Sequence, residues 1–223
     1  YHMPSTYSIR VPVASPFCAK ALPTPGPATV QLALIRSAIE LYGLETTCNE
    51  LFPHVIACEP KVQPPDSVAI TSQLVHMYKA DDYGRLREAV GYREFCHCDG
   101  LIRIFVRVQN NLVRAFTEAL QMIGYWGRCD SLASCVEVNC VQPEVGNCIQ
   151  RFDKLPERTR TRPHFSAFVS EFIRNDIRWT EIVPSGQGRA KPPTSSQLYV
   201  WPLTVSKPDW AAQVLRFTPF AYG

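Results

Sequence analysis

An aromatic residue flanked by two arginines lies near the middle of the chain. Because side chains alternate along a strand, a strand over Leu101–Val108 would present Arg103, Phe105 and Arg107 on one face. An aromatic ring between two guanidinium groups can stack on a base while the cations neutralise phosphates. The same alternation is also typical of a solvated sheet face whose Phe is covered by another segment. Both interpretations stay open.

Two further segments carry cations. After Pro143, five basic residues crowd a short run: Arg151, Lys154, Arg158, Arg160 and Arg162. Such a run either tracks phosphates or forms a solvated loop. The Gly-rich loop from Ser185 to Lys191 has backbone amides that could approach a phosphate, although it lacks the spacing and the Lys-Ser/Thr ending of a P-loop.

Proton transfer would depend on histidines, because their side chains titrate near neutral pH. Apart from His2, the chain offers His54, His76, His97 and His164. His76 has a tyrosine and a lysine close by in sequence, which suits binding as well as catalysis. His97 lies in a Cys-His-Cys triplet that lacks the two-residue spacer of common zinc sites, so we expect no metal.

The composition is that of a folded globular protein. The 223 residues are 46% hydrophobic and 19% charged, which excludes a disordered chain. The net charge of +3 permits nucleic-acid binding without proving it. Nine cysteines without an export signal predict reduced thiols in a cytoplasmic protein, and no run is apolar enough for a membrane span. The opening Tyr1-His2-Met3 is interpreted as a cloning remnant outside the fold.

One helix must organise the elements that position these residues. Gly26 and Pro27 predict its start, because a proline at the first helical position loses no useful donor, and Gly43 predicts its end. Its apolar residues cover a wide arc, so we expect it to pack on a sheet, with Gln31 on the solvent side. They form two rows: Val30, Leu34, Ala38 and Leu41, and Leu32, Ile35, Ile39 and Tyr42.

Before residue 143 the predicted elements follow the order strand, helix, strands, helix, strand. The strands are Thr6–Val13, short runs at His54–Cys58 and Val68–Met77, a hairpin of Tyr92–Cys98 with Leu101–Val108, and Leu132–Val141; the second helix is Asn110–Trp126. Asp99-Gly100 is a strong turn signal for the hairpin reversal, and the segment from Lys61 to Asp66 is typical of a projecting tip. This order is the α+β, ferredoxin-like (RRM-like, βαββαβ) pattern, with both helices on one sheet face.

The C-terminal part is predicted to be a β-rich extension. Its pattern indicates a short helix over His164–Ile173 and strands over Arg178–Val183 and Gln197–Val205. We therefore divide the chain into a ferredoxin-like domain over residues 4–142 and an extension over residues 143–223 that packs on it.

Three segments resemble motifs of the CRISPR-associated RAMP superfamily. They are the Pro-rich helix entry Pro25–Thr29, the Arg93-Glu94-Phe95 strand, and the segment from Gly127 to Ser131 after the second helix. The nearest likeness is the Cascade subunit that caps the 5′ handle of the CRISPR RNA (crRNA) in type I complexes. The resemblance covers about the first two-thirds of the chain and not its C-terminal third. It implies a projecting β-hairpin thumb, here near residues 57–79.

The resemblance implies a non-catalytic, RNA-binding subunit of a Cascade surveillance complex in antiviral defence. Its implied partners are the crRNA 5′ handle and the Cascade backbone and large subunits, with target DNA as a further option and with no cofactor. The candidate RNA-binding residues are Lys20 and Thr29 at the helix entry, Arg93 and Phe95 on the strand, Arg128 and Ser131 after the second helix, and Arg189 and Lys191 in the Gly-rich loop.

Two alternative functions remain. Some RAMP relatives cut precursor RNA without metal, and in one subtype a Lys-His dipeptide and a Tyr are expected to carry that reaction. The chain has no Lys-His dipeptide, so we expect no catalytic residue. The other alternative is a stand-alone RNA-binding module, for which the Lys/Arg-Gly-aromatic run of RNA-recognition motifs is missing.

Overall fold

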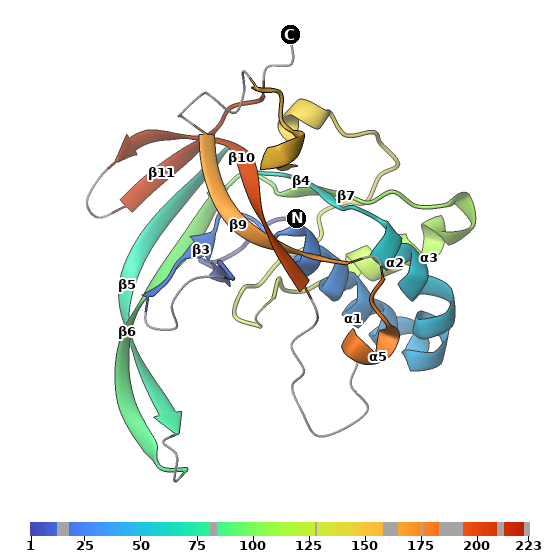
Figure 1. Ribbon diagram of the computed structural model, residues 1–223, viewed down its shortest axis with the longest axis horizontal. Helices are drawn as coiled ribbons and strands as arrows, with labels where there is room; N and C mark the ends of the chain where they lie inside the picture. The colour runs from blue at the N-terminus through green and yellow to red at the C-terminus, as the bar shows by residue number, and fades with distance from the viewer. Residues whose placement is uncertain are drawn as a thin grey trace.

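Helices and mostly antiparallel strands share one core in this protein, which confirms the α+β prediction (Figure 1). The computed structural model describes residues 1–12, 18–80, 84–127, 129–157, 165–174, 176–182, 194–208 and 212–220. The predictions for Arg128, Arg158–Arg162, His164, Arg189 and Lys191 lie outside these ranges.

The organising helix, α1 (Pro27–Thr46), begins where the sequence predicted. Gly26 precedes it in extended conformation, Pro27 opens it, and its apolar rows are buried along its first half. Gly43 has φ +79°, but it bends the helix instead of ending it. The chain continues through a π-helical segment, η1 (Thr47–Leu51), into α2 (Phe52–Ala57), so the extended run predicted at His54–Cys58 is wrong.

A buried glutamine explains why the chain stays helical there. Gln31, predicted to face solvent, is 3% exposed, and its side-chain amide donates to the carbonyls of Val55 and Cys58 at 3.1 and 3.0 Å. These carbonyls at the end of α2 have no partner within their own helix. Gln31 therefore satisfies them and fixes α2 against α1.

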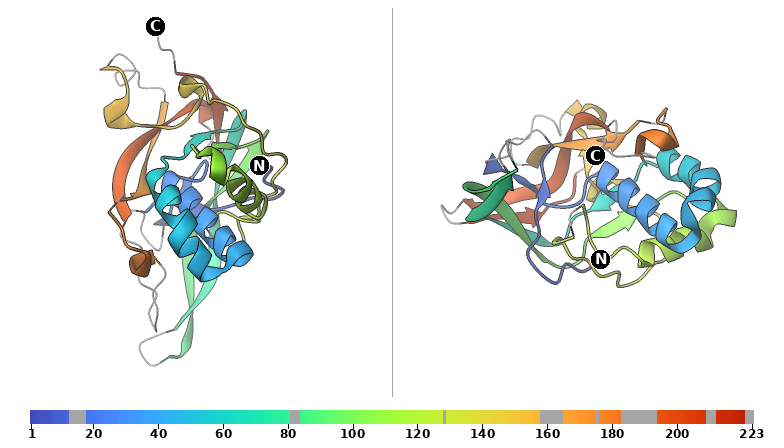
Figure 2. Two further views of the ribbon diagram at one scale, coloured as in Figure 1. Left: turned by 90° about the vertical axis from the view of Figure 1, so that its right-hand side faces the viewer. Right: turned by 90° about the horizontal axis from the view of Figure 1, so that it is seen from below.

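The main sheet combines strands from both parts of the chain. Its order is β2 (Cys18–Ala19), β6 (Leu86–Asp99), β5 (Ser67–Ala80), β11 (Ala212–Phe217), β10 (Thr194–Pro208) and β8 (Gln150–Arg151), with β9 (Phe165–Ile173) also paired to β10. Because β11 pairs with β5, the C-terminal strands extend the sheet that the earlier strands begin. β9 packs against α1, so the sheet curves around this helix (Figures 1 and 2).

Three C-terminal predictions have different outcomes. The strand predicted at Gln197–Val205 lies within β10 and is confirmed. The predicted helix at His164–Ile173 is instead β9, because its residues pair with the whole first half of β10. The predicted strand at Arg178–Val183 is wrong, because a short helix, α5 (Trp179–Ile182), places Trp179 edge-on against Phe52.

Two long, bent strands replace the predicted Asp99-Gly100 hairpin. β5 pairs with β6 from Ser67–Asp99 to Ala80–Leu86, which confirms the extended run at Val68–Met77. β4 (Lys61–Gln63) pairs with β7 (Arg103–Phe105) in the same register, since Ser67 is four positions after Gln63 and Arg103 is four positions after Asp99. The chain therefore passes through Gly100 without reversing.

The outer half of the β5–β6 hairpin projects from the body (Figures 1 and 2). We call the described residues of this half, 72–80 and 84–94, the arm. It overlaps the thumb predicted near residues 57–79 in its first strand and continues beyond it into β6. The segment from Lys61 to Asp66 is not a projecting tip, because Val62 is fully buried opposite Ile104.

The first residues belong to the fold, so their interpretation as a remnant outside it is wrong. Met3 is 2% exposed, and the ring of Tyr1 packs edge-on against Trp126 at 4.9 Å between centroids. Tyr7 then pairs with Cys96, and β1 (Ile9–Arg10) pairs with β3 (Ala21–Leu22). The predicted strand at Thr6–Val13 is thus present as two short pairings.

The second predicted helix is present but ends early. A 3-10 turn, η2 (Asn110–Leu112), leads into α3 (Val113–Gln121), whose predicted stripe includes the buried residues Phe116 and Leu120. The strand predicted at Leu132–Val141 does not form. Among residues 132–141, Leu132 and Ser134 alone pair with described residues, each in an isolated bridge. Short 3-10 turns, η3 (Val145–Asn147) and η4 (Phe152–Lys154), follow it.

Four of the described cysteines, Cys58, Cys96, Cys98 and Cys148, are buried, whereas Cys129 and Cys140 are exposed. All eight whose side chains the structure describes are free, and burial raises the pKa of Cys58 to about 12 and that of Cys98 to about 11. The described side chains contain no group of His, Cys, Asp and Glu that could hold a metal ion. No helix in the described ranges is long and apolar enough to cross a membrane.

Candidate nucleic-acid interface

The outward-facing residues of the β6–β7 strand form one surface, which we call the outer strip. Side chains alternate along a strand, and the inward residues Cys96, Cys98 and Ile102 are buried. The residues between them face away from the core. The outer strip comprises Arg93, Phe95, His97, Asp99, Leu101, Arg103, Phe105 and Arg107. The strand predicted at Leu101–Val108 is present only as β7, Arg103–Phe105, and the exposure of Arg103 and Arg107 agrees with the predicted alternation.

The neighbouring strand adds polar residues to this surface. In the antiparallel ladder, Gln73 lies opposite Arg93, Gln63 opposite Arg103, and Lys61 opposite Phe105. Residues directly opposite each other share a face of the sheet. Phe105 is thus surrounded by three cations, namely Lys61, Arg103 and Arg107.

The cations of the strip are available to a ligand. Arg103 and Arg107 are exposed, and no described carboxylate forms an ion pair with either of them or with Arg93. Phe95 and Phe105 are half-buried, so part of each ring is accessible. Accessible rings between unpaired cations can bind a single strand through base stacking and phosphate contacts.

Two of the predicted RNA-binding residues lie at one end of the strip, and the segment that carries a third, Lys20, runs alongside β6. Arg93 and Phe95 belong to the strip, and Ala19 pairs with Arg93 in β2. Lys20 follows directly and is exposed. The next amide, that of Ala21, donates to the Glu94 carboxylate at 2.9 Å and fixes this segment against β6.

The other described candidates form a separate group. Thr29, half-buried in the first turn of α1, has its methyl group 3.9 Å from the position that a Cβ would take at Gly127. The helix entry and the turn after α3 are therefore neighbours. Ser131 is fully buried, and its hydroxyl accepts a hydrogen bond from the Ser8 amide at 3.3 Å. The Ser131 hydroxyl therefore has a structural role in the interior of the protein.

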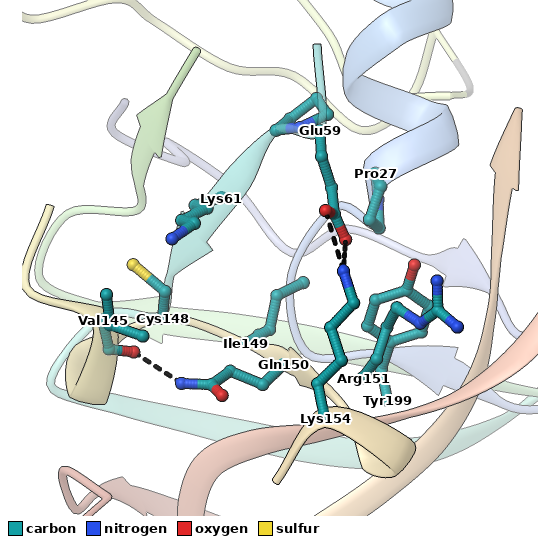
Figure 3. A pocket seen from close by; sticks show the side chains of 11 residues that line it. Pro27, Glu59, Lys61, Val145, Cys148, Ile149, Gln150, Arg151, Lys154 and Tyr199 are labelled. Atoms are coloured by element: carbon teal, nitrogen blue, oxygen red, sulfur yellow. Dashed lines mark hydrogen bonds and ion pairs between the residues drawn. The ribbon is translucent and has the colours of Figure 1, made fainter. Parts of the chain in front are cut away.

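A pocket of about 290 Å³ lies at the start of α1 (Figure 3). Two cations of the basic run line it, and both are paired: Arg151 with Asp153 at 2.6 Å and Lys154 with Glu59 at 3.1 Å. Burial raises the pKa of Tyr199 to about 12, so its hydroxyl stays protonated at neutral pH. Side chains that line this pocket can donate hydrogen bonds, but the charges of Arg151 and Lys154 are neutralised by Asp153 and Glu59.

No protein-family model matches the chain. A CRISPR-associated protein Cas5 from Archaeoglobus fulgidus is 25% identical to it over 142 residues. The chain resembles Cas5. The aligned region covers 61% of this chain and 61% of that protein, so the chain spans less than two thirds of the relative's length. The similarity confirms the resemblance to the CRISPR-associated RAMP group and supports a CRISPR-associated function.

The structure adds residues that the motifs behind the Cas5 resemblance did not indicate. Lys61 joins the outer strip only because β4 pairs with β7, and no local signal in the sequence predicts that pairing. The arm is the second addition. One face of the arm continues the core-facing side of β5 and β6 beyond the body of the protein. This face carries large exposed apolar side chains: Leu74, Tyr78, Leu86, Val90 and Tyr92. The apolar alternation on both sides of the polar stretch from Asp81 to Arg85 was the available signal for this hairpin.

Proposed function

We propose that this protein is a non-catalytic subunit of a type I Cascade complex that binds the 5′ handle of the crRNA. The observation that carries the proposal is the outer strip, where Phe95 and Phe105 alternate with the unpaired cations Arg93, Arg103 and Arg107. Single-stranded RNA is recognised by stacking of splayed bases and by phosphate contacts, and this strip offers both. The similarity to Cas5 supports a crRNA as the ligand.

The arm is the proposed contact for a neighbouring Cascade subunit. Tyr78 and Leu86 are 72% and 73% exposed, so they contribute little to the core. Exposed apolar side chains gathered on one face are typical of protein interaction sites. The neighbour would cover this face while the outer strip holds the RNA.

We also propose that the first part of the chain has a ferredoxin-like arrangement. In support, β4 and β7 are antiparallel neighbours, and the paired side chains Tyr42 and Glu118 hold α1 and α3 together.

The decisive experiment mixes the purified protein with labelled precursor crRNA in EDTA and reads a native and a denaturing gel. We expect a shift with intact RNA that is lost when the handle is scrambled. Arg93→Ala should weaken the shift, whereas Arg114→Ala should not, because Arg114 lies on α3 and is paired with Glu118 at 2.8 Å. An equal shift with scrambled RNA would refute handle recognition.

The same gels test the enzymatic alternative. Specific cleavage in EDTA would identify a metal-independent ribonuclease and would refute the non-catalytic assignment. His76 and His97 would then be the first residues to replace. His76 lies on the arm, where its Nδ1 is 2.8 Å from Glu88 Oε1, and His97 lies on the outer strip.

A further inference from the structure

A groove of about 1060 Å³ separates β7 from the extended segment 136–143. Val113, Phe116 and Leu120 of α3 form its apolar floor. Both walls have unpaired backbone edges: β7 pairs only with β4, and the described residues make no backbone–backbone hydrogen bond to segment 136–143. An open strand edge beside a segment with unpaired backbone groups is unusual, because such an edge readily accepts another strand.

The first residues of the chain show where a strand between these walls would lie. Tyr1 and Ile102 exchange backbone hydrogen bonds, with N···O distances of 2.7 and 3.0 Å, and Tyr7 and Cys96 exchange two more. Tyr7 is six positions after Tyr1, and Ile102 is six positions after Cys96, so both pairs share one antiparallel register. On the other wall, His2 exchanges two bonds of 2.9 Å with Ser134.

The same registers lead directly into the groove. Continued upstream of Tyr1, six further positions would face residues 103–108 on one wall and residues 136–141 on the other. These positions account for most of the residues that line the two walls. Six residues of strand span about 20 Å.

We propose that the groove accepts one β-strand, formed by polypeptide that joins the amino end of Tyr1 and runs antiparallel to both walls. The strand would have a defined pattern. Tyr1 points toward α3, since its hydroxyl donates to the Leu120 carbonyl at 2.6 Å. Side chains alternate, so the second, fourth and sixth positions upstream face the apolar floor and are apolar. The first, third and fifth positions face outward beside Arg103, Phe105 and Arg107.

The chemistry of the groove favours a peptide over a nucleic acid. Only a peptide backbone supplies N–H and C=O groups at the spacing that both edges require. The Tyr1 amino nitrogen already occupies the position of a strand amide. Burial lowers its pKa, which shows that a charged amine is disfavoured there, and a peptide bond would remove that charge.

The inserted strand would complete a four-stranded antiparallel sheet. Its order would be segment 136–141, the new strand, β7 and β4, with α3 covering one face. This is the strand order expected of a ferredoxin-like fold. The inference does not depend on RNA binding, and its test contains no RNA, so the two proposals can fail separately.

The test compares two extensions of equal composition before Tyr1. Val-Thr-Val-Thr-Val-Thr places valines on the floor, and Thr-Val-Thr-Val-Thr-Val places them outward, because a one-residue shift exchanges the two faces. Hydrogen exchange is measured on the unextended chain and on both variants. We expect the first extension to slow amide exchange at least tenfold in residues 103–108 and 136–141 and to raise the Tm, and the second to do neither.

Three results would overturn the proposal. One is unchanged exchange on both walls with the first extension, and another is equal protection by the two extensions. The third comes from adding the first hexapeptide as a separate molecule to the unextended chain. Protection by the free peptide, without protection by the fused extension, would assign the groove to a strand from another molecule.

Discussion

Gly100 lies against the backbone of Asp66 at the bend of the two long strands. A Cβ at Gly100 would be 3.3 Å from the Asp66 amide nitrogen and 3.1 Å from its Oδ2, and the backbone has φ +94°. The backbone conformation favours glycine, since other residues rarely adopt such a φ, and a Cβ would in addition crowd Asp66. The bend leaves β4 and β7 beside the helices while β5 and β6 continue into the arm.

We therefore predict that Gly100→Ala destabilises the protein by about 2 kcal/mol or more, from backbone strain and from crowding against Asp66. Gly84→Ala is the matched control. Gly84 also has a positive φ, of 75°, but nothing lies within 4 Å of its Cβ position. Urea unfolding of both variants measures the difference. A Gly100 variant that is no less stable than the Gly84 variant would show that the contact with Asp66 does not matter.

Replacing Gln31 with Leu should cost about 2–4 kcal/mol. The substitution removes the amide that donates to the carbonyls of Val55, Ile56 and Cys58. The Val55 carbonyl still accepts from the Cys58 thiol, so the cost comes mainly from the other two carbonyls, at roughly 1–3 kcal/mol for each unsatisfied group. Gln121→Leu, at the exposed end of α3, is the control and should change stability by less than about 0.5 kcal/mol. Similar midpoints in a urea titration of the two variants would contradict the role assigned to Gln31.

Two substitutions on the outer strip should separate stacking from charge. Arg103→Ala should weaken RNA binding and lower the slope of log K against log salt by about 0.7, as expected for one lost phosphate contact on a single strand. Phe105→Leu should weaken binding by roughly 1–3 kcal/mol and leave that slope unchanged, because base stacking involves no counterion. Titrations at several salt concentrations measure both effects. If both variants bind like the wild type, the strip is not the RNA surface.

The arm should be dispensable for folding but needed for assembly. Tyr78→Ser combined with Leu86→Ser should leave the Tm nearly unchanged, because both side chains are largely exposed. The pair should abolish co-purification with the Cascade backbone subunit while RNA binding persists. Undiminished co-purification would exclude this face as the subunit contact.

Acid should weaken the contact between α1 and α3. Hydrogen bonds from Arg114, and then from Tyr42, hold the pKa of Glu118 below its usual value of 4.5. A carboxyl with a depressed folded-state pKa contributes stability above its unfolded pKa, and this contribution is lost as the pH falls through the folded value. Melting curves between pH 6 and pH 3 should therefore show a steeper loss in the wild type than in Glu118→Gln. Tyr42→Phe should be intermediate. Parallel profiles would show that Glu118 does not contribute.

The sequence alone determined the features that depend on near neighbours in the chain. The start of α1 at Gly26 and Pro27 follows from local backbone preferences. The outward position of Arg103, Phe105 and Arg107 follows from the period of a strand, whatever that strand pairs with. Arg93 and Phe95 were found in the same way, by residue type on a predicted strand.

Only the tertiary structure decided which strands pair. The Asp99-Gly100 signal is local and equally compatible with a reversal or a bend, and the pairing of β7 with β4 selected the bend. The run at His164–Ile173 became a strand because β10 offers it a partner, and Lys61 reached the outer strip through another long-range pairing. Strand pairing depends on hydrogen bonds between segments far apart in sequence, and neither segment alone specifies its partner.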